Sequence, residues 1–267
     1  MQQQESQAPP SRTEPSEALV ARMASENPTC LISFSRGKDS IAAYLAIRDK
    51  FERVVPYFYE VVPGLEFVED SLAYFEQKMG RRIIRLPAPG FYRMLNQLLY
   101  QPPYTYDLIQ WLGVEKHSHD DMQIAVCEDE GLDYETTYNA LGMRAKDSMQ
   151  RTLYFQKNGP VNYTRKLFYP IWDWDKQRVI DVIRHAGWKL PVDYRYFPAS
   201  FDGLYTRFLV PIKRYFPRDW ERICNLFPLI ELDIMRYESA VAAGQQPPYV
   251  PPPGAKVYVS KRNQGVV

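Results

Sequence analysis

Residues 30–40 have the sequence C-L-I-S-F-S-R-G-K-D-S. Their apolar first half, residues 30–34, predicts a short strand buried on both faces, as strands of a parallel sheet are. Residues 40–51 carry apolar side chains at helical spacing, so a helix is expected to follow. A loop between a strand's carboxyl end and a helix's amino end is a natural anion site, because the first helical N–H groups have no intrahelical acceptor.

The same alternation continues along the chain. Strands are expected at residues 54–59 and 82–86, and between them lies an amphipathic helix at residues 67–79 that Gly80 ends. Strands separated by helical crossovers are typical of an α/β protein with a parallel sheet. Further helices are expected at residues 17–24, 119–130 and 175–186, and further strands at residues 137–141 and 167–171.

The chain is expected to divide into four consecutive parts. Residues 1–16 are rich in Gln, Ser and Pro and predict a disordered leader, and residues 17–200 predict the α/β domain. Residues 201–243 predict a helical C-terminal subdomain, and the Pro-rich residues 244–267 predict an extended tail.

Composition narrows the class of protein. The 33 basic and 32 acidic residues give a net charge of +1, which provides no general attraction to nucleic acid or membranes. Cys30, Cys127 and Cys224 are far apart, so we expect no disulfide framework and no cysteine metal site, and the usage fits a reducing cytoplasm. The sequence shows no signal peptide, and no run approaches the length of a membrane-spanning helix.

The loop after the first strand carries a glycine, two hydroxyls, an ammonium and a carboxylate, at Gly37, Ser35, Ser40, Lys38 and Asp39. The glycine permits a bend or a close approach of the backbone, the hydroxyls can donate hydrogen bonds, and the lysine can neutralise phosphate charge. The carboxylate can hold a magnesium ion or cap the helix. The alternative is an ordinary capped helix after a glycine turn.

The loop is not a Walker A motif. Ile32 stands where that motif has its first glycine, and Asp39 stands where a Ser or Thr follows the lysine. The sequence therefore disfavours a kinase or a GTPase.

Residues 33–40, S-F-S-R-G-K-D-S, resemble the S-G-G-x-D-S loop of the PP-loop ATP pyrophosphatases. More narrowly, they resemble the phosphoadenosine phosphosulfate (PAPS) reductase family of the adenine nucleotide α-hydrolase-like superfamily. Residues 141–151, L-G-M-R-A-K-D-S-M-Q-R, resemble the G-x-R-x-x-E-S-x-x-R stretch of that family, and residues 169–174, Y-P-I-W-D-W, resemble its P-I-x-D-W stretch. The three motifs stand in the family's order and cover about residues 30–191.

The resemblance implies a Rossmann-like (HUP-type) parallel sheet, flanked by helices, that binds ATP or a related adenine nucleotide. It implies that the nucleotide is contacted by Ser33, Ser35, Arg36, Gly37, Lys38, Asp39, Ser40, Gly142, Arg144 and Arg151. Lys38, Asp39 and Arg144 are expected to act in catalysis, and Asp39 to hold Mg²⁺. Independently, the planar fork of arginine suits phosphate oxygens. The alternative for residues 141–151 is a solvated surface on which Asp147 pairs with a Lys or Arg.

Departures from the family pattern affect the interpretation. Arg36 replaces the first glycine of the loop, which is costly if that position has a positive φ, although the side chain could instead add a phosphate contact. Asp147 replaces the usual Glu. The catalytic cysteine of the E-C-G-x-H type is missing, and Cys224 lies in an apolar helical stretch where an inert core thiol is expected.

The leading hypothesis is an ATP-dependent enzyme that releases pyrophosphate and adenylylates an acceptor. The acceptor is left open, with nucleic acid as one candidate, and so is a homo-oligomer or a partner protein; no membrane is expected. A second hypothesis is a non-catalytic nucleotide-binding or regulatory protein. A third is a sulfonucleotide (PAPS) reductase that uses Cys224 or an external thiol.

Four other features bear on function or on helix ends, and the first three have two interpretations each. The H-x-H-D-D run at residues 117–121 predicts either a metal site or, more simply, a helix N-cap. The basic and aromatic residues 213–222 predict either a polynucleotide surface or a helical face with buried rings. Asp173 either caps the helix expected near residue 175 or has a ligand role, and His185 fits a helix C-terminus.

Overall fold

We describe residues 13–113, 117–245 and 254–260 of a computed structural model of the chain. They form two compact units that interleave along the sequence. Unit 1 comprises residues 1–34, 38–56 and 127–189, and unit 2 comprises residues 35–37, 57–126 and 190–267. The consecutive division expected from the sequence stays a prediction, and most of its leader and tail lies outside the described residues.

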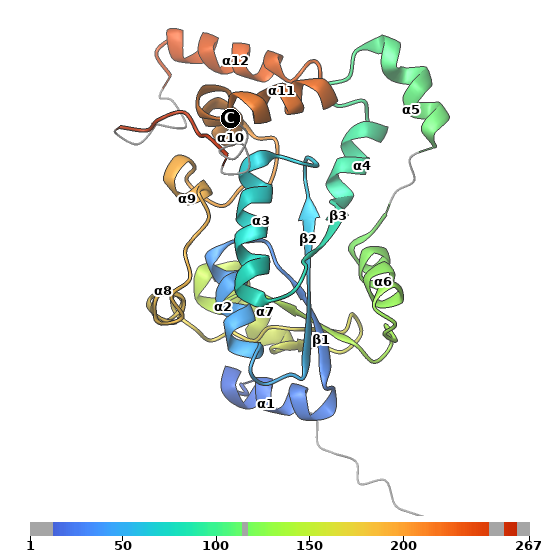
Figure 1. Cartoon of the computed structure of the whole chain (residues 1–267), viewed down its shortest axis with the longest axis vertical. Coiled ribbons are helices and arrows are strands. Elements are labelled where there is room, and N and C mark those ends of the chain that lie inside the picture. Colours follow the sequence, from blue (N-terminus) through green and yellow to red (C-terminus); the bar gives the residue numbers. More distant parts are fainter. Residues whose placement is uncertain (1–12, 114–116, 246–253, 261–267) are drawn as a thin grey trace, which may run out of the picture. The chain divides into compact units, whose positions relative to one another are not determined.

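The sheet has six strands in the order β3-β2-β1-β4-β6-β5. Figure 1 labels β1, β2 and β3. The strand bounds are Thr29–Ser33 for β1, Arg53–Glu60 for β2, Ile84–Pro87 for β3, Tyr138–Leu141 for β4, Val161–Asn162 for β5 and Leu167–Phe168 for β6. The pairs β2–β3, β1–β4 and β4–β6 are parallel, and β5 pairs with β6 antiparallel. The chain thus has the Rossmann-like α/β fold that the sequence predicted.

The strand order reverses between β1 and β4. The chain runs outward from β1 through β2 to β3 and then returns to place β4 on the other side of β1. Loops that leave two such strands diverge, so an open α/β sheet binds its ligands at the carboxyl ends of the strands at this point. Two loops leave the sheet at this point: the loop after β1, which belongs to the motif at residues 33–40, and the loop after β4, which belongs to the motif at residues 141–151.

Unit 1 contains α1 Ser16–Glu26, α2 Lys38–Ile47, η2 Ala145–Asp147, α7 Met149–Asn158 and α8 Lys176–His185. In β1, Cys30, Leu31 and Ile32 are buried, as expected for a strand covered on both faces. The helix α2 packs against α8, and the Tyr44 ring stacks on Trp188 with centroids 5.6 Å apart. This packing fixes the axis of α2 and hence where its N-terminus lies.

Unit 2 contains most of the remaining helices: α3 Glu66–Met79, α4 Pro89–Asn96, η1 Pro103–Thr105, α5 Tyr106–Leu112, α9 Asp193–Tyr196, α10 Thr206–Tyr215, α11 Pro217–Leu226 and α12 Glu231–Ala242. The helix α6, His119–Asp129, runs from unit 2 into unit 1. A cluster of phenylalanine rings with centroids 5.0–5.6 Å apart joins α3, α10 and α11, at Phe67, Phe197, Phe201, Phe208 and Phe216. The C-terminal region is therefore helical, as predicted.

Several elements differ from the sequence-based expectation, among them α5, α9 and β5, where no helix or strand was expected. The strand expected at residues 167–171 ends after Phe168, because Pro170 has no N–H to donate to a sheet. The helix α7 was not expected; Ser148 caps it by accepting a hydrogen bond from the backbone N–H of Arg151. Its exposed apolar residues obscure the helical periodicity, since Met149 and Leu153 both face solvent.

Candidate nucleotide-binding site

The loop between β1 and α2 has its left-handed residue at Arg36, with φ of 64°. A side chain at such a φ costs about 1–2 kcal/mol relative to glycine. The expectation that arginine is costly at this position is therefore confirmed, and the bend of the loop falls at Arg36 rather than at Gly37. Something else in the fold must hold the residue in this conformation.

The guanidinium of Arg36 has its partners in unit 2. It is fully buried, and its two terminal nitrogens donate to the two carboxylate oxygens of Asp193, both over 3.2 Å. It also donates to the Ser71 hydroxyl over 3.0 Å and lies 5.2 Å from the centre of the Phe58 ring. Because the guanidinium is committed to these groups, contact between Arg36 and a nucleotide falls to its backbone.

Gly142, the first residue after β4, touches the start of α2 in unit 1. A Cβ added to Gly142 would lie 2.7 Å from the carbonyl of Asp39 and 2.7 Å from the backbone nitrogen of Ser40. No real Cβ occupies such a position, so only glycine lets these two backbones meet. The parallel register that pairs Ser33 with Leu141 brings the two loops together here.

Five charged side chains form an alternating chain beside this contact. The Lys38 ammonium donates to one oxygen of Asp39 over 2.6 Å, and Arg144 Nε donates to the other over 2.7 Å. Arg144 also donates to Asp147 over 2.5 Å, and Asp147 accepts from Arg151. Three cations are thus balanced by two carboxylates. The pairing of Asp147 with arginine is the alternative that the sequence had left open.

Arg144 is the deepest member of this chain, with a side chain that is only 3% exposed. The side chains of Lys38 and Asp39 are 25% and 19% exposed, and that of Arg151 is 42% exposed. A buried arginine that is held in place by two carboxylates cannot swing freely. It offers a fixed fork for phosphate oxygens once a ligand competes for it.

The remaining predicted residues lie around the same loop. Ser33 ends β1, Ser35 is exposed in the loop, and Ser40 is buried in the first turn of α2. The structure therefore brings Lys38, Asp39 and Ser40 of the first motif together with Gly142 and Arg144 of the second.

The P-I-x-D-W stretch serves the structure of unit 1. Asp173 accepts hydrogen bonds from the backbone N–H and the hydroxyl of Ser16, so it caps α1 rather than α8. Asp175 caps α8 by accepting from the backbone N–H of Arg178 over 2.8 Å. The expectation that Asp173 caps the helix near residue 175 is thus wrong. Asp175 caps that helix, and Asp173 caps α1 instead, because the N-terminal segment folds back onto this loop.

The histidine motifs have structural roles. Ser118 and Asp121 cap α6 reciprocally, with backbone N–H distances of 2.7 and 3.1 Å. In the described part of the chain, no cluster of three or more His, Cys, Asp or Glu side chains is placed to hold a metal ion. The ring Nδ1 of His185 lies 2.7 Å from the carbonyl of Asp181 in the last turn of α8.

The basic and aromatic stretch at residues 213–222 is engaged within unit 2. Lys213 pairs with Glu231 over 3.0 Å and lies over the Trp220 ring, and Arg218 pairs with Glu66 over 3.3 Å. Burial raises the pKa of the half-buried Cys224 thiol, which lowers its reactivity. These contacts favour the interpretation of a packed helical face with an inert thiol.

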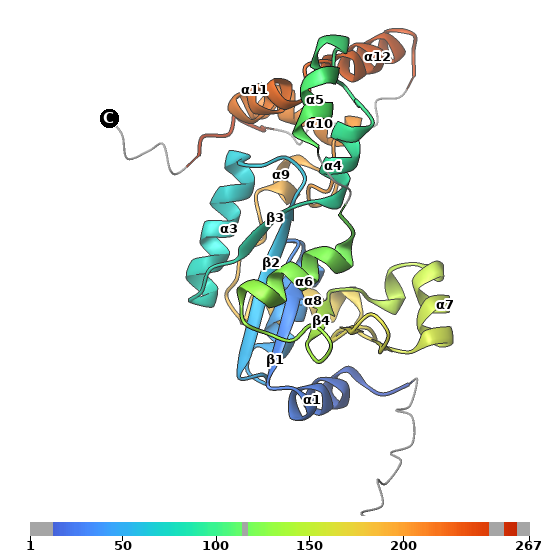
Figure 2. The same ribbon diagram turned by 90° about the vertical axis from the view of Figure 1, so that its right-hand side faces the viewer.

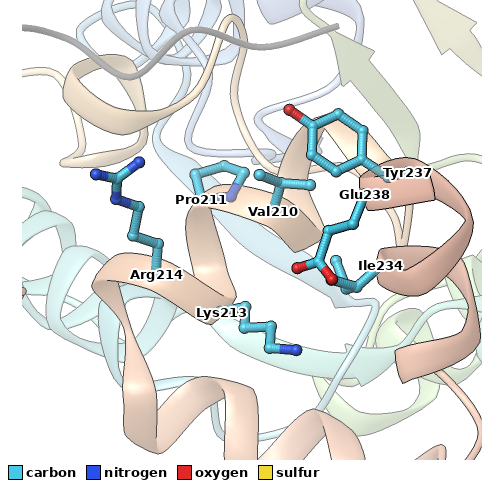
Figure 3. Close-up of a pocket in the computed structure, with 7 residues that line it drawn as sticks. All are labelled: Val210, Pro211, Lys213, Arg214, Ile234, Tyr237 and Glu238. Atoms are coloured by element: carbon cyan, nitrogen blue, oxygen red, sulfur yellow. The ribbon is translucent and has the colours of Figure 1, made fainter. Parts of the chain in front are cut away.

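An open depression of about 350 Å³ lies between α10 and α12. Figure 3 shows its lining residues, which are Val210, Pro211, Lys213, Arg214, Ile234, Tyr237 and Glu238. None of the residues predicted to contact a nucleotide lines it. We therefore place the candidate site at the carboxyl ends of β1 and β4 and not in this depression.

Sequence reasoning missed two members of the arrangement. Asp193 holds Arg36 from 157 positions away, and no local pattern marks it. Asp147 was expected to pair with a Lys or Arg only in the alternative to a nucleotide site, yet it links Arg144 to Arg151 beside that site. A carboxylate three and four residues from basic side chains in a phosphate motif is the signal that could have found it.

No family model and no curated protein matches the sequence. Among solved structures, the chain is similar to a PAPS reductase from Candida auris in complex with phosphate, at 15% identity and a TM-score of 0.40 over 70% of this chain and 88% of that one. It is similar to the U34-tRNA thiolase NcsA from Methanococcus maripaludis with its [4Fe-4S] cluster, at 12% identity and a TM-score of 0.41 over 94% of this chain and 88% of that one.

A third structure, a subunit of tRNA methyltransferase from Methanocaldococcus jannaschii, has 14% identity and a TM-score of 0.28 over 87% of this chain and 97% of that one. Because all three TM-scores are below 0.5, these likenesses carry no argument about activity. Within the described ranges, the helices are all too short or too polar to cross a membrane.

Proposed function

We propose that the chain binds an adenine nucleotide, with ATP as the first candidate, and cleaves it between the α- and β-phosphates. The observation that carries this proposal is the contact of Gly142 with the backbone of Asp39 and Ser40. It brings the N-terminus of α2, the Lys38 ammonium and the Arg144 guanidinium to one place at the carboxyl ends of two parallel strands. Amide hydrogens, an ammonium and a planar cation are the groups that bind polyphosphates.

Each group has a role in this proposal. The amides at the start of α2 and Lys38 hold the β- and γ-phosphates, and Arg144 stabilises charge at the α-phosphate. An acceptor oxygen attacks the α-phosphorus, the bond from that phosphorus to the bridging oxygen breaks, and pyrophosphate leaves. The acceptor then carries the AMP group. The protein contributes position and electrostatics, as in other phosphoryl chemistry.

Asp39 is the residue that fits a magnesium ion. Carboxylate oxygens are ligands that Mg²⁺ prefers, and a bound ion would offset charge on the β- and γ-phosphates. Both oxygens of Asp39 are engaged, one by Lys38 and one by Arg144. With a nucleotide and its ion bound, Asp39 would hold the ion, and the phosphates would take its place as partners of Lys38 and Arg144.

The acceptor is proposed to be anionic, with nucleic acid as the class to test first. Residues 138–172 contain six basic residues and one acidic residue, although the whole chain has a net charge of +1. This segment includes Arg144 and the exposed helix α7, so the positive charge is concentrated beside the proposed phosphate site. Concentrated positive charge attracts a phosphate backbone and makes its binding depend on salt.

Thermal-shift measurements with ATP, AMP and PAPS, each with and without Mg²⁺, test the nucleotide. The melting temperature should rise with ATP and Mg²⁺, and Lys38→Ala and Arg144→Ala should each reduce the rise. Lys213→Ala is the matched control, because Lys213 pairs with Glu231 in unit 2 and should leave the rise unchanged. Equal stabilisation of all four proteins would contradict the assignment of residues.

Pyrophosphate release in the presence of single-stranded RNA, DNA or small acceptors tests the reaction. Release that needs both ATP and an acceptor supports the proposed enzyme. Tight ATP binding with no release for any acceptor favours the non-catalytic hypothesis. Preferential stabilisation by PAPS, together with thiol-dependent turnover that Cys224→Ser abolishes, favours the reductase hypothesis instead.

A further inference from the structure

An apolar stripe runs along the outer side of η1 and α5 in unit 2. Its members are Tyr104, Leu108, Trp111 and Leu112, with exposed fractions of 81%, 56%, 80% and 55%. Their spacing of four, three and one residues puts them on one side of a helical segment. Ile109, in contrast, is only 6% exposed and anchors α5 to unit 2. We call these four residues the α5 stripe.

The segment before the α5 stripe is held firmly. The backbone N–H of Leu229 donates to the carbonyl of Tyr100 over 2.9 Å, and the side-chain amide of Gln101 donates to the carbonyl of Leu226 over 2.7 Å. The Tyr100 hydroxyl also donates to Asp233 in α12. Figure 2 shows α5 directly beyond α4, with which it is in contact. The backbone that leads into the α5 stripe is thus already fixed, which reduces the backbone entropy lost when the stripe binds a partner.

The charges around the α5 stripe select the kind of partner. Residues 99–112 contain no Lys or Arg and a single acidic residue, Asp107. A nucleic acid or an anionic lipid surface needs positive charge, so neither fits this surface. A charged protein partner would gain no steering from it either. A nearly neutral apolar face can, however, meet an identical face across a two-fold axis without repulsion between like charges.

The exposed area is sufficient for a stable pair. A tyrosine or tryptophan side chain offers about 150–250 Å², so the α5 stripe offers on the order of 600 Å² at the exposures given above. Contact through a two-fold axis buries that area on each of the two copies, which makes about 1,200 Å² in total. This total exceeds the area of about 1,000 Å² that a specific interface needs. Tyrosine and tryptophan are also the residues that contribute most at interface centres.

We propose that the α5 stripe is the interface of a homodimer, in which α5 of one copy packs against α5 of a second copy. The proposal does not rest on the nucleotide site, whose residues Lys38, Asp39, Gly142 and Arg144 lie in unit 1. Trp111, the most exposed ring of α5, lies at the centre of this interface. The dimer therefore forms or fails independently of nucleotide binding.

Sedimentation velocity and light scattering on the full chain, from low to high micromolar concentration, test the dimer. The wild type should be dimeric. Leu108→Glu and Trp111→Glu should each weaken self-association about thirtyfold or more, the loss expected when a hot-spot residue is removed. Leu153→Glu in α7 is the matched control, because Leu153 is 57% exposed and lies outside the α5 stripe. It should leave the dimer intact.

Circular dichroism and the ATP-dependent thermal shift check that the variants fold. A wild type that stays monomeric at high micromolar concentration overturns the proposal, and so does a dimer that survives both glutamate variants.

Discussion

Arg36→Gly tests how the β1–α2 loop is held. Glycine relieves the left-handed conformation at residue 36, where φ is 64°, and this relief is worth about 1–2 kcal/mol. The same change removes both guanidinium hydrogen bonds to Asp193, whose side chain is fully buried. Breaking a buried ion pair by removing one partner costs about 3–5 kcal/mol. The second effect is larger, so the variant should lose about 2–3 kcal/mol of folding free energy.

Differential scanning calorimetry measures this loss as a fall in melting temperature of about 5–10 °C, which is the size expected for a chain of this length. The partner change Asp193→Asn should cost a similar amount when made alone, because it leaves the Arg36 guanidinium buried without its counter-charge. The amide oxygen still accepts the hydrogen bond that Asp193 now accepts from the backbone N–H of Phe201, over 2.9 Å.

The double variant Arg36→Gly/Asp193→Asn completes the cycle. It has neither buried charge and keeps the bond to Phe201, so it should recover at least half of the loss of either single variant. The reasoning is refuted if Arg36→Gly is as stable as the wild type. It is refuted equally if the two losses simply add, since the ion pair would then contribute nothing to holding the loop.

Three further changes probe other contacts. Gly142→Ala should reduce both the melting temperature and the stabilisation by ATP, because the added Cβ would lie 2.7 Å from backbone atoms. Gly90→Ala is the control and should change neither, because its added Cβ would have only a side-chain nitrogen at 4.0 Å as a neighbour. Asp147→Asn should tighten ATP binding several-fold in isothermal titration calorimetry, because it removes a carboxylate that competes with phosphate for two arginines. Burial raises the pKa of Asp219 to about 6, so the native chain binds more protons than the unfolded chain and loses stability as pH rises from 3.8 to about 6. Asp219→Asn removes this loss. Measured by calorimetry, the melting temperature of the variant minus that of the wild type should therefore increase as pH rises from 3.8 to about 6. If this difference stays constant over the interval, Asp219 does not titrate there.

The sequence predicted those helices and strands whose own residues determine their structure. The strand at residues 30–34, the helix at residues 67–79 and the left-handed Gly80 after it are confirmed, because burial on both faces, helical periodicity and a C-terminal glycine all leave marks in the sequence. The strand β5 and its antiparallel pairing with β6 were missed, because β5 is only two residues long and shows no alternation. Short strands are selected by their neighbours and not by their own residues.

The candidate site divides in the same way. The meeting of Lys38 and Arg144 around Asp39 follows from two loops that leave parallel strands at the same edge, and that could be anticipated. The anchor of Arg36 in Asp193 could not, because a fold-level choice brings together residues 157 positions apart. Arg36 departs from the loop pattern, and Asp193, the residue that compensates for it, is close in space but distant in the sequence.

The self-balanced charges beside α2 have a consequence for selectivity. Three cations and two carboxylates already pair with one another there, so inorganic phosphate alone would have to displace a carboxylate without offering it a new partner. A polyphosphate that brings a divalent cation would supply new partners for both the cations and the carboxylates. If the proposed nucleotide binds beside α2, we expect it to be selected over lone anions for this reason.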